Sequence, residues 1–184
     1  RYLDIDGDGI PYRTIPGNQN PDASYFNRGT GHSAYAVYSE KPEDWVENMA
    51  RLNHKFDTGR DMAPGPIVQQ VASAKVGLIA YGSTLPAIDE ARARLAEAGI
   101  ELSFLRLRAL PINDAVRDFV ADHERCYVVE LNRDGQMHQI LCAEMPEAAT
   151  RLISLAHMDG MSLTAAWLGE RLSAVSFQPS ADGR

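Results

Sequence analysis

The sequence predicts an α/β fold, a three-layer αβα domain with a mostly parallel sheet, preceded by an irregular segment and a helix. From about Lys75 onward, short apolar runs typical of buried strands alternate with amphipathic helical segments. Such alternation is typical of a parallel sheet covered by helices on both faces. Residues 1–40 instead are rich in Gly, Pro, Asn, Asp and aromatic residues and show little periodicity. Long irregular segments of this kind are usually functional or packed against something larger.

The first helix is expected over about 42–57. Pro42 suits a first helical turn, and four apolar residues recur on one face at helical spacing. The stretch DTGRDMAPGPIV (57–68) is expected to be a linker, because Gly and Pro interrupt both helices and strands. The four apolar residues on one face of the predicted helix 42–57 are Trp45, Met49, Leu52 and Phe56. The chain is thus expected to consist of a connecting segment (1–62), a domain (63–178) and a tail (179–184).

The strands and helices of the domain follow in order, and each helix has a candidate capping residue. Ser83 or Thr84 is expected to cap the first of these helices, Asn113 the second and Ser162 the last. Gly99 closes the first helix. Strands are expected at 75–82, 100–110, 125–131 and 150–157, and helices at 86–99, 112–123, 134–144 and 163–175.

Charge and composition exclude several classes of partner. The net charge of −7 argues against nucleic acid or an anionic membrane surface. No stretch approaches the roughly 20 apolar residues that cross a bilayer. Cys126 and Cys142 form no C-x-x-C pair, so neither a zinc site nor an iron–sulfur cluster is expected from this chain alone. Reduced, buried thiols and a cytoplasmic location are the expectation.

The acidic run DIDGDG at the N-terminus raises the question of a calcium loop. Asp4, Asp6 and Asp8 alternate as in the start of an EF-hand loop. Such a loop needs a bidentate carboxylate at its twelfth position, which here is Ile15, and no helical pattern flanks it. An acidic, glycine-rich structural turn is therefore the favoured interpretation, and no metal site is predicted.

Two turns at the ends of predicted strands are candidates for binding a ligand or a subunit. In YGST, a glycine before a helix N-terminus could hold an anion through Ser83 and Thr84, although helix capping is favoured. In VVELNRDGQM, polar residues follow a strand, where α/β sheets place ligands. A buried turn network explains them equally well. The candidates in this second turn are Asn132, Gly135 and Gln136.

The loop RGTGHS is a candidate substrate-binding loop. Arg28 and His32 flank Thr30, and offer a fixed cation and a titratable donor to a carboxylate. Gly29 and Gly31 allow close backbone approach. A structural loop in which Arg28 pairs with a neighbouring carboxylate is the alternative. The chain contains neither H-E-x-x-H nor G-x-S-x-G, so no catalytic residue is assigned.

Four motifs taken in order, DGDGIPYRTIPG, RGTGHSAYAVYSE, VGLIAYGST and VVELNRDGQM, resemble the C-terminal part of the alpha subunit of 2-oxoacid:ferredoxin oxidoreductases, most closely the 2-oxoglutarate type. The resemblance implies a transketolase C-terminal-like domain over 63–178. It also implies that 1–62 is a connecting segment, with or without the tail of a pyrimidine-binding domain. The chain is accordingly expected to be a fragment.

The resemblance further implies oxidative decarboxylation of 2-oxoglutarate to succinyl-CoA by a complex. Thiamine diphosphate, magnesium and iron–sulfur clusters would reside in the complete complex and not in this chain. The implied partners are the beta subunit, ferredoxin and coenzyme A. The isolated chain is expected to be inactive, because the family's Y-P-I-T-P motif is absent. Two alternatives stay open: a pyruvate or branched-chain 2-oxoacid enzyme, and a stand-alone α/β ligand-binding module.

Overall fold

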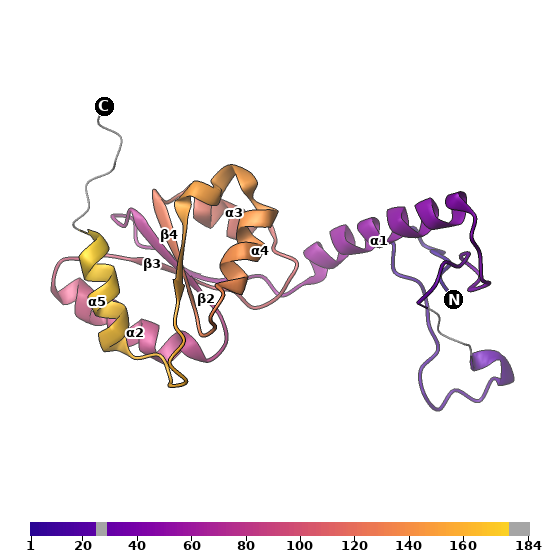
Figure 1. The fold of residues 1–184 in the computed structure, drawn as a ribbon, viewed down its shortest axis with the longest axis horizontal. Coiled ribbons are helices and arrows are strands. Elements are labelled where there is room, and N and C mark those ends of the chain that lie inside the picture. The colour runs from indigo at the N-terminus through magenta and orange to yellow at the C-terminus, as the bar shows by residue number, and fades with distance from the viewer. Residues whose placement is uncertain (25–28, 177–184) are drawn as a thin grey trace. The chain divides into compact units, whose positions relative to one another are not determined.

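The computed structural model describes residues 1–24 and 29–176, and the chain divides into two compact units, Arg1–Ala63 and Pro64–Arg184 (Figure 1). Arg28, which the sequence assigns to substrate binding, lies outside the described residues, as does the predicted tail 179–184. The assignment of the two parts to a connecting segment and a transketolase C-terminal-like domain stays a prediction.

The Pro64–Arg184 unit is built on one five-stranded sheet with the order β1-β3-β2-β4-β5. All neighbouring pairs are parallel except β1 with β3, which are antiparallel. The predicted α/β class with a mostly parallel sheet is confirmed. The strands are β1 (Ile67–Gln69), β2 (Val76–Ala80), β3 (Ser103–Arg106), β4 (Arg125–Glu130) and β5 (Leu152–Ala156).

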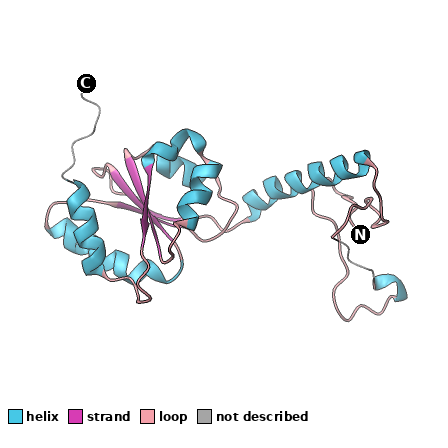
Figure 2. Cartoon of the chain, in the orientation of Figure 1, coloured by secondary structure: helices cyan, strands magenta, loops and turns pink. Residues whose placement is uncertain are grey.

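Helices cover both faces of this sheet, which gives three layers (Figure 2). The side chains of α2 and α5 pack on one face, and those of α3 and α4 pack on the other. The α-helices are α2 (Leu85–Glu97), α3 (Asp114–Ala121), α4 (Gln136–Glu144) and α5 (Ala165–Ser176), and the 3₁₀-helices are η2 (Gly82–Thr84) and η3 (Pro146–Arg151).

The central strands are apolar throughout because both of their faces are buried. Successive residues of β2 point to opposite layers, so Leu78 packs with α2 and α5 whereas Ile79 packs with α3 and α4. Gly77 is required for close packing, since a Cβ there would lie 2.7 Å from the Phe119 ring and 3.0 Å from Cys126 Sγ. The core of this unit therefore lies on both sides of β2 and β4.

The Arg1–Ala63 unit contains α1 (Pro42–Met62) and one short 3₁₀-helix, η1 (Pro21–Ala23). A bridge between His32 and Tyr38 is the β-type pairing of its described part. The helix continues beyond the predicted end at residue 57, and residues 57–62 are not a linker. A single Gly59 inside a helix costs only about 1 kcal/mol, so the helix ends where Pro64, Gly65 and Pro66 follow.

Two other expectations from the sequence are corrected. β1 lies inside the predicted linker, where a three-residue strand beside two prolines gives little periodic signal. Ser162 does not cap the last helix: Thr164 precedes α5, and its Oγ1 accepts a hydrogen bond from the Trp167 N–H at 3.2 Å. Asn113 occupies the N-cap position of α3, but its side chain makes no capping hydrogen bond. Among the described helices, none is long and apolar enough to span a membrane.

Candidate functional site

Polar side chains gather at the carboxyl ends of β2 and β4. These strands are neighbours, and the chain leaves β2 toward β3 on one side before it returns to β4 on the other. Open α/β sheets bind ligands at such a point, where the strand order reverses. All the ligand or subunit-contact candidates of this unit lie at this edge: Ser83 and Thr84 after β2, and Asn132, Gly135 and Gln136 after β4.

The Glu130 carboxylate, at the last residue of β4, lies at the centre of these polar groups and is fully buried. Its Oε2 accepts the Met137 N–H at 2.9 Å, and its Oε1 accepts the His138 N–H at 3.0 Å. Both N–H groups belong to the first turn of α4 and have no partner within the helix. A negative charge at this end is also favoured by the helix dipole. Glu130 therefore caps α4 from within the sheet.

Asn132 holds the turn between β4 and α4. Its Oδ1 accepts the backbone N–H groups of Asp134, Gly135 and Gln136 at 3.1, 2.7 and 3.3 Å. Gly135 has a φ of +63°, and a Cβ there would lie 2.6 Å from Ser154 Oγ. A glycine is therefore needed both for the left-handed backbone and for the close approach of β5.

Tyr81, directly after β2, connects that strand to the same network. Its hydroxyl donates to Glu130 Oε2 at 3.4 Å and lies 3.5 Å from the Asn132 side-chain nitrogen. Asn132 Nδ2 also donates to Glu130 Oε2 at 2.5 Å. Burial raises the pKa of Tyr81, and the charge of Glu130 raises that pKa further, whereas the hydrogen bond from Asn132 opposes the rise. The phenol thus stays protonated and serves as a donor to the carboxylate.

Ser83 and Thr84 lie in η2, beside Tyr81. Thr84 is buried, and its Oγ1 donates to the Tyr81 carbonyl at 2.9 Å. It occupies the N-cap position of α2 but makes no capping hydrogen bond with its side chain, so the predicted cap is corrected. Ser83 is exposed and lies within η2. Of the two hydroxyl groups, that of Ser83 is the accessible one.

The polar network at the carboxyl ends of β2 and β4 stabilises the turn between β4 and α4. Glu130 and Asn132 together accept five backbone N–H groups of the turn and of the first turn of α4. These are the groups that would otherwise bind an anion at a helix N-terminus. The structure brings the candidates together as a hydrogen-bonded network, and a ligand or subunit contact by them stays a prediction.

The loop at Gly29–His32 belongs to the other unit. Thr30 is exposed. A Cβ at Gly31 would lie 2.5 Å from the Ser39 carbonyl oxygen, and the Ser39 N–H donates to the Gly31 carbonyl at 3.2 Å. The close approach that this glycine permits is therefore made by the chain's own backbone. A Cβ at Gly29 would meet nothing within 4 Å.

Three contacts fix the position of His32. Its ring stacks on that of Tyr2, with centroids 4.0 Å apart and 18° between the planes. Its Nδ1 lies 3.0 Å from the Ser33 carbonyl oxygen, to which a proton on Nδ1 would be donated. Its own carbonyl accepts a hydrogen bond from Asn48 Nδ2 at 2.5 Å, and the same amide donates to the Asp44 carbonyl at 2.9 Å. Asn48 is only 8% exposed, so it anchors this loop to α1.

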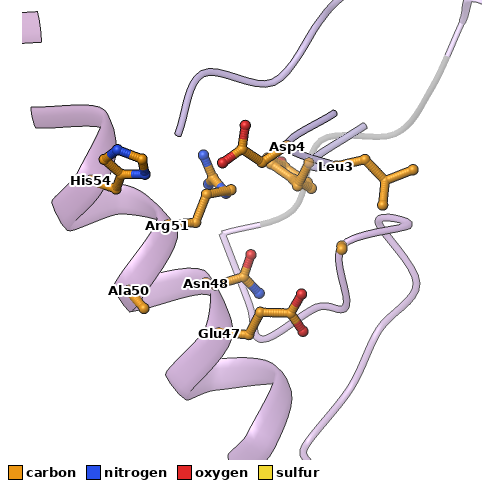
Figure 3. A pocket seen from close by; sticks show the side chains of 9 residues that line it. Leu3, Asp4, Glu47, Asn48, Ala50, Arg51 and His54 are labelled. Carbon is orange, nitrogen blue, oxygen red and sulfur yellow. The ribbon is translucent and has the colours of Figure 1, made fainter. Parts of the chain in front are cut away.

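A cavity of 390 Å³ lies on the same unit, between the N-terminal segment and α1 (Figure 3). Glu47, Asn48 and Arg51 project toward it from α1. The Arg51 guanidinium donates to the Gly9 carbonyl at 3.0 Å and lies over the Tyr2 ring. Charges of both signs thus line the cavity. Its lining comprises Tyr2, Leu3, Asp4, Ala34, Glu47, Asn48, Ala50, Arg51 and His54.

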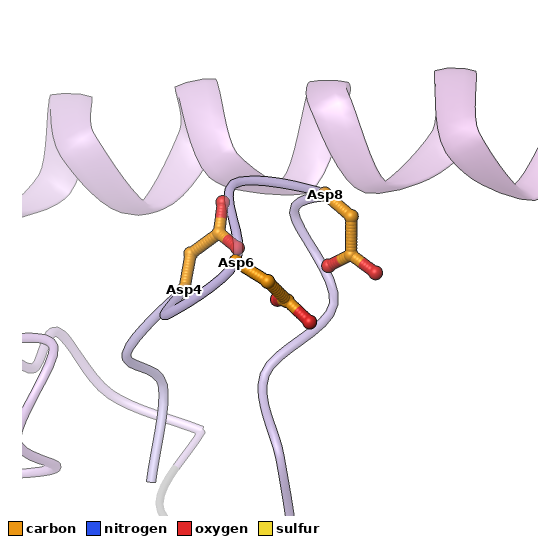
Figure 4. Close-up of side chains that lie close together, drawn as sticks. All are labelled: Asp4, Asp6 and Asp8. Atoms are coloured by element: carbon orange, nitrogen blue, oxygen red, sulfur yellow. The ribbon is translucent and has the colours of Figure 1, made fainter.

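The acidic turn packs along α1 (Figure 4). Asp4 closes it by accepting the N–H groups of Gly7 and Gly9 at 3.0 and 2.9 Å. On the α1 side, Thr58 Oγ1 donates to the Asp8 carbonyl at 2.6 Å. A Cβ at Gly9 would lie 2.4 Å from the Lys55 backbone nitrogen, so the turn touches the helix backbone. These contacts give the turn a structural role.

The three aspartates nevertheless place carboxylate oxygens within 4.8 Å of one another. Asp6 Oδ2 already accepts the Tyr12 hydroxyl at 2.9 Å, and Asp8 Oδ1 accepts the Ile10 N–H at 2.7 Å. Calcium sites in proteins use six to eight oxygen ligands. This partly exposed cluster does not by itself define a metal site.

Sequence reasoning did not anticipate the central positions of Tyr81, Asn48 and Tyr2. Tyr81 contacts Glu130 only because β2 and β4 are neighbours in the sheet. Asn48 is a polar residue within an amphipathic helical pattern and reaches the loop 16 residues earlier. The sequence around Asn48 mixes polar and apolar residues and gives no local signal, and its partner depends on the tertiary fold.

The strand order and the helices on both faces of the sheet define a doubly wound, three-layer α/β domain. It is preceded by a unit with a long helix, α1. No model of a known protein family and no curated protein matches the chain. Among solved structures it is similar to a 2-oxoglutarate:ferredoxin oxidoreductase from Magnetococcus marinus with 2-oxoglutarate, coenzyme A and succinyl-CoA bound. The TM-score is 0.74 at 22% identity, over 95% of this chain and 30% of that chain. The chain thus spans less than a third of the length of that protein, and at this identity the similarity establishes the fold.

Proposed function

We propose that the chain is the C-terminal part of the alpha subunit of a thiamine-diphosphate-dependent 2-oxoacid:ferredoxin oxidoreductase of the 2-oxoglutarate type. The main support is the extent of the structural similarity, which covers 95% of this chain and therefore both of its units. The four sequence motifs that suggest the same family are distributed over both units as well.

In this proposal the chain serves assembly and completes a site that other parts of the complex build. Thiamine diphosphate, magnesium and the iron–sulfur clusters reside elsewhere in the complex, with the beta subunit as partner and coenzyme A and ferredoxin as co-substrates. The isolated chain is inactive. The satisfied network around Glu130 supports a structural role for the sheet unit, because its donors and acceptors are directed to one another.

The Arg28–His32 loop is proposed to contact the distal carboxylate of the oxoacid. An enclosed dicarboxylate needs a partner for its second charge. His32 supports this role, because stacking on Tyr2 and the contact of Nδ1 with the Ser33 carbonyl orient the ring. In this proposal the imidazolium form donates from both nitrogens, Nδ1–H to Ser33 and Nε2–H to the carboxylate. Thr30 is exposed beside it and supplies a hydroxyl group.

The test uses the complete complex, assayed for coenzyme A-dependent reduction of ferredoxin by 2-oxoglutarate. Removing a charge-assisted hydrogen bond costs about 1.5–3 kcal/mol, so Arg28→Ala and His32→Ala are each expected to raise the KM for 2-oxoglutarate roughly ten- to a hundredfold. Lys55→Ala, which removes an exposed cation of α1 that does not line the cavity, is the control.

A parallel assay with pyruvate separates the alternatives. Pyruvate lacks the distal charge, so its kinetics should change far less in both variants. Equal losses for both substrates would indicate a structural loop, and unchanged kinetics would remove the loop from the site. A complex that prefers pyruvate or a branched-chain oxoacid would refute the 2-oxoglutarate type.

A further inference from the structure

An aspartate followed by a glycine is the dipeptide in which a protein backbone rearranges most readily. The glycine nitrogen attacks the carboxyl carbon of the aspartate, and a succinimide ring forms with loss of water. Glycine favours this step because no Cβ shields its nitrogen. Water then reopens the ring, and opening at the main-chain carbonyl leaves isoaspartate. The chain contains five such dipeptides, of which the structure describes Asp6–Gly7, Asp8–Gly9, Asp134–Gly135 and Asp159–Gly160, whereas Asp182–Gly183 lies outside the described residues.

The four described dipeptides differ in the hydrogen bonds of their glycine N–H groups and not in backbone conformation. Their glycines all have a positive φ, of +75°, +78°, +63° and +80° in chain order. The N–H groups of Gly7 and Gly9 donate to the Asp4 carboxylate at 3.0 and 2.9 Å. That of Gly135 donates to Asn132 Oδ1 at 2.7 Å. Each of these hydrogen bonds must break before the nitrogen can lose its proton and attack, so each slows the reaction.

Asp159–Gly160, in the loop between β5 and α5, lacks this protection. The Gly160 N–H has no hydrogen-bond partner among the residues that the structure describes. Gly160 is exposed, and the Asp159 side chain is 52% exposed. Gly9 and Gly135, by contrast, are buried. Water therefore reaches both reacting groups of Asp159–Gly160.

The Asp159 carboxylate also has a proton donor beside it. His157 Nε2 lies 3.1 Å from Asp159 Oδ1, and the Met161 N–H donates to the same oxygen at 2.8 Å. The His157 ring is held in place by the Trp167 ring, with 4.5 Å between the centroids. A protonated imidazole at this distance acts as a general acid toward an oxygen that leaves as water.

The other described dipeptides have different groups on their carboxylates. Asp134 pairs with Arg133, whose guanidinium does not give up a proton. Asp6 accepts the Tyr12 hydroxyl, and Asp8 accepts the Ile10 N–H. None of these three donors is a general acid near neutral pH. Both the free glycine N–H and the acid therefore occur together at Asp159–Gly160.

We propose that Asp159–Gly160 is a site of spontaneous isoaspartate formation, with His157 as the proton donor. The Gly160 nitrogen forms a bond to Asp159 Cγ, and the bond between Cγ and Oδ1 breaks. Oδ1 leaves as water, with one proton from the Gly160 nitrogen and one from the His157 imidazolium. A second water opens the ring to aspartate or isoaspartate, and the carboxyl group that forms returns a proton to the solvent. The net change is an isomerisation that adds one atom to the main chain of this loop, and it does not depend on the reaction proposed for the complex.

The test follows the full chain during storage at neutral pH. Trypsin separates the dipeptides into the peptides 2–13, 134–151, 152–171 and 172–184, of which the first contains both Asp6 and Asp8. The isomer has an unchanged mass and is resolved by chromatography, and in water enriched in heavy oxygen each opening of the ring adds one solvent oxygen. We expect the isomer to accumulate in 152–171 several-fold faster than in 2–13 and 134–151.

Storage in urea is the control for local sequence. Unfolding removes the hydrogen bonds of Gly7, Gly9 and Gly135, so the three peptides should then form the isomer at similar rates. Equal rates in the folded chain would overturn the proposal. A difference between the peptides that persists in urea would overturn it as well, because the folded structure would not select the site.

Two variants test the roles of the side chains. His157→Gln cannot supply the proton and is expected to slow the isomerisation in 152–171 several-fold, whereas His54→Gln, at an exposed histidine of α1, should have no effect. Asp159→Glu should abolish the isomer in this peptide, because the larger ring that glutamate would form closes far more slowly. An unchanged or faster rate in His157→Gln would refute the role of His157 as proton donor. An isomer that persists in Asp159→Glu would refute the site.

Discussion

The two units of this chain distribute their apolar residues in opposite ways. In the sheet unit, strands and helices direct apolar side chains inward, and Leu78, Ile79 and Val128 are completely buried. In the described part of Arg1–Ala63, α1 instead directs the polar Asn48 inward and leaves Trp45 exposed. The difference indicates that the sheet unit is stabilised by its own apolar core. The described part of Arg1–Ala63 is held instead by polar contacts to the backbone.

The largest expected effect tests this contrast through core truncation. Ile79→Ala removes a fully buried side chain of β2 and should destabilise the sheet unit by about 2–5 kcal/mol. Met62→Ala and Met161→Ala, both 72% exposed, should change stability by no more than about 0.5 kcal/mol. Urea unfolding can be followed for each unit, because Trp45 reports one and Trp167 the other.

The core substitution also tests the independence of the units. If Ile79→Ala shifts the Trp167 transition and leaves that of Trp45 unchanged, the two units unfold separately. A common shift of both signals would contradict the division of the chain into independently stabilised parts.

The next largest effect concerns the buried carboxylate. Glu130→Ala leaves the N–H groups of Met137 and His138 without their acceptor, which should cost about 3 kcal/mol. Glu97→Ala, an exposed glutamate at the end of α2, serves as the control and should be near neutral. Thermal unfolding measures both. A Glu130→Ala variant as stable as the control would show that the network is not structural and would renew the case for a functional role.

The acidic turn allows a comparable test in the other unit. Gly7 and Gly9 have φ values of +75° and +78°, so Ala is strained at both positions by a similar amount. Only at Gly9 would the new Cβ meet the Lys55 backbone. Gly9→Ala should therefore be about 1–3 kcal/mol less stable than Gly7→Ala. Equal stabilities, measured by the Trp45 transition, would show that the turn is not docked on α1.

Alkaline pH should destabilise the sheet unit. Burial raises the pKa of Cys126 from 9.0 to about 12. The raised pKa favours the thiol in the folded state, so this stabilisation is complete below pH 9 and is lost as the pH rises toward 12. Between pH 9 and 10 the loss should be about 1 kcal/mol. Cys126→Ala should remove this contribution and leave that of Tyr81 and Tyr127, whose pKa values are also raised by burial. Cys142→Ala, whose thiol pKa is raised by burial as well, should retain most of the slope.

The sequence predicted the sheet unit well because its signals are local. Apolar runs such as 76–80 and breakers such as Gly99 mark strands and helix ends without knowledge of the fold. The three-residue β1 has no periodicity of its own and exists because it pairs with β3. The spacing of apolar residues predicted α1 as a helix. It did not predict that the apolar side chains of Trp45 and Met49 would be exposed in this unit.

The candidate sites show the same limit. Asn132 and Gly135 were indicated by turn chemistry at the end of a strand, which is a local signal. The contact of Tyr81 with Glu130 requires two strands that are 45 or more residues apart to be neighbours. The stacking of His32 on Tyr2 likewise brings together residues 30 positions apart. Such pairs depend on tertiary structure and cannot be predicted from the sequence pattern.

The smallest expected effect is that of calcium on the Arg1–Ala63 unit. Both oxygens of Asp4 already accept backbone N–H groups, and Asp6 accepts the Tyr12 hydroxyl, so the turn is closed without an ion. A ligand that binds only the folded state raises the Tm measurably once its concentration exceeds its Kd. Millimolar calcium should therefore leave the Trp45 transition unchanged, whereas Asp4→Ala should lower its midpoint in the absence of any metal. A rise of the Tm by several degrees with calcium, abolished by Asp6→Ala, would show that the acidic turn binds an ion. The Arg1–Ala63 unit would then be stabilised by calcium as well as by the polar contacts of the turn with α1.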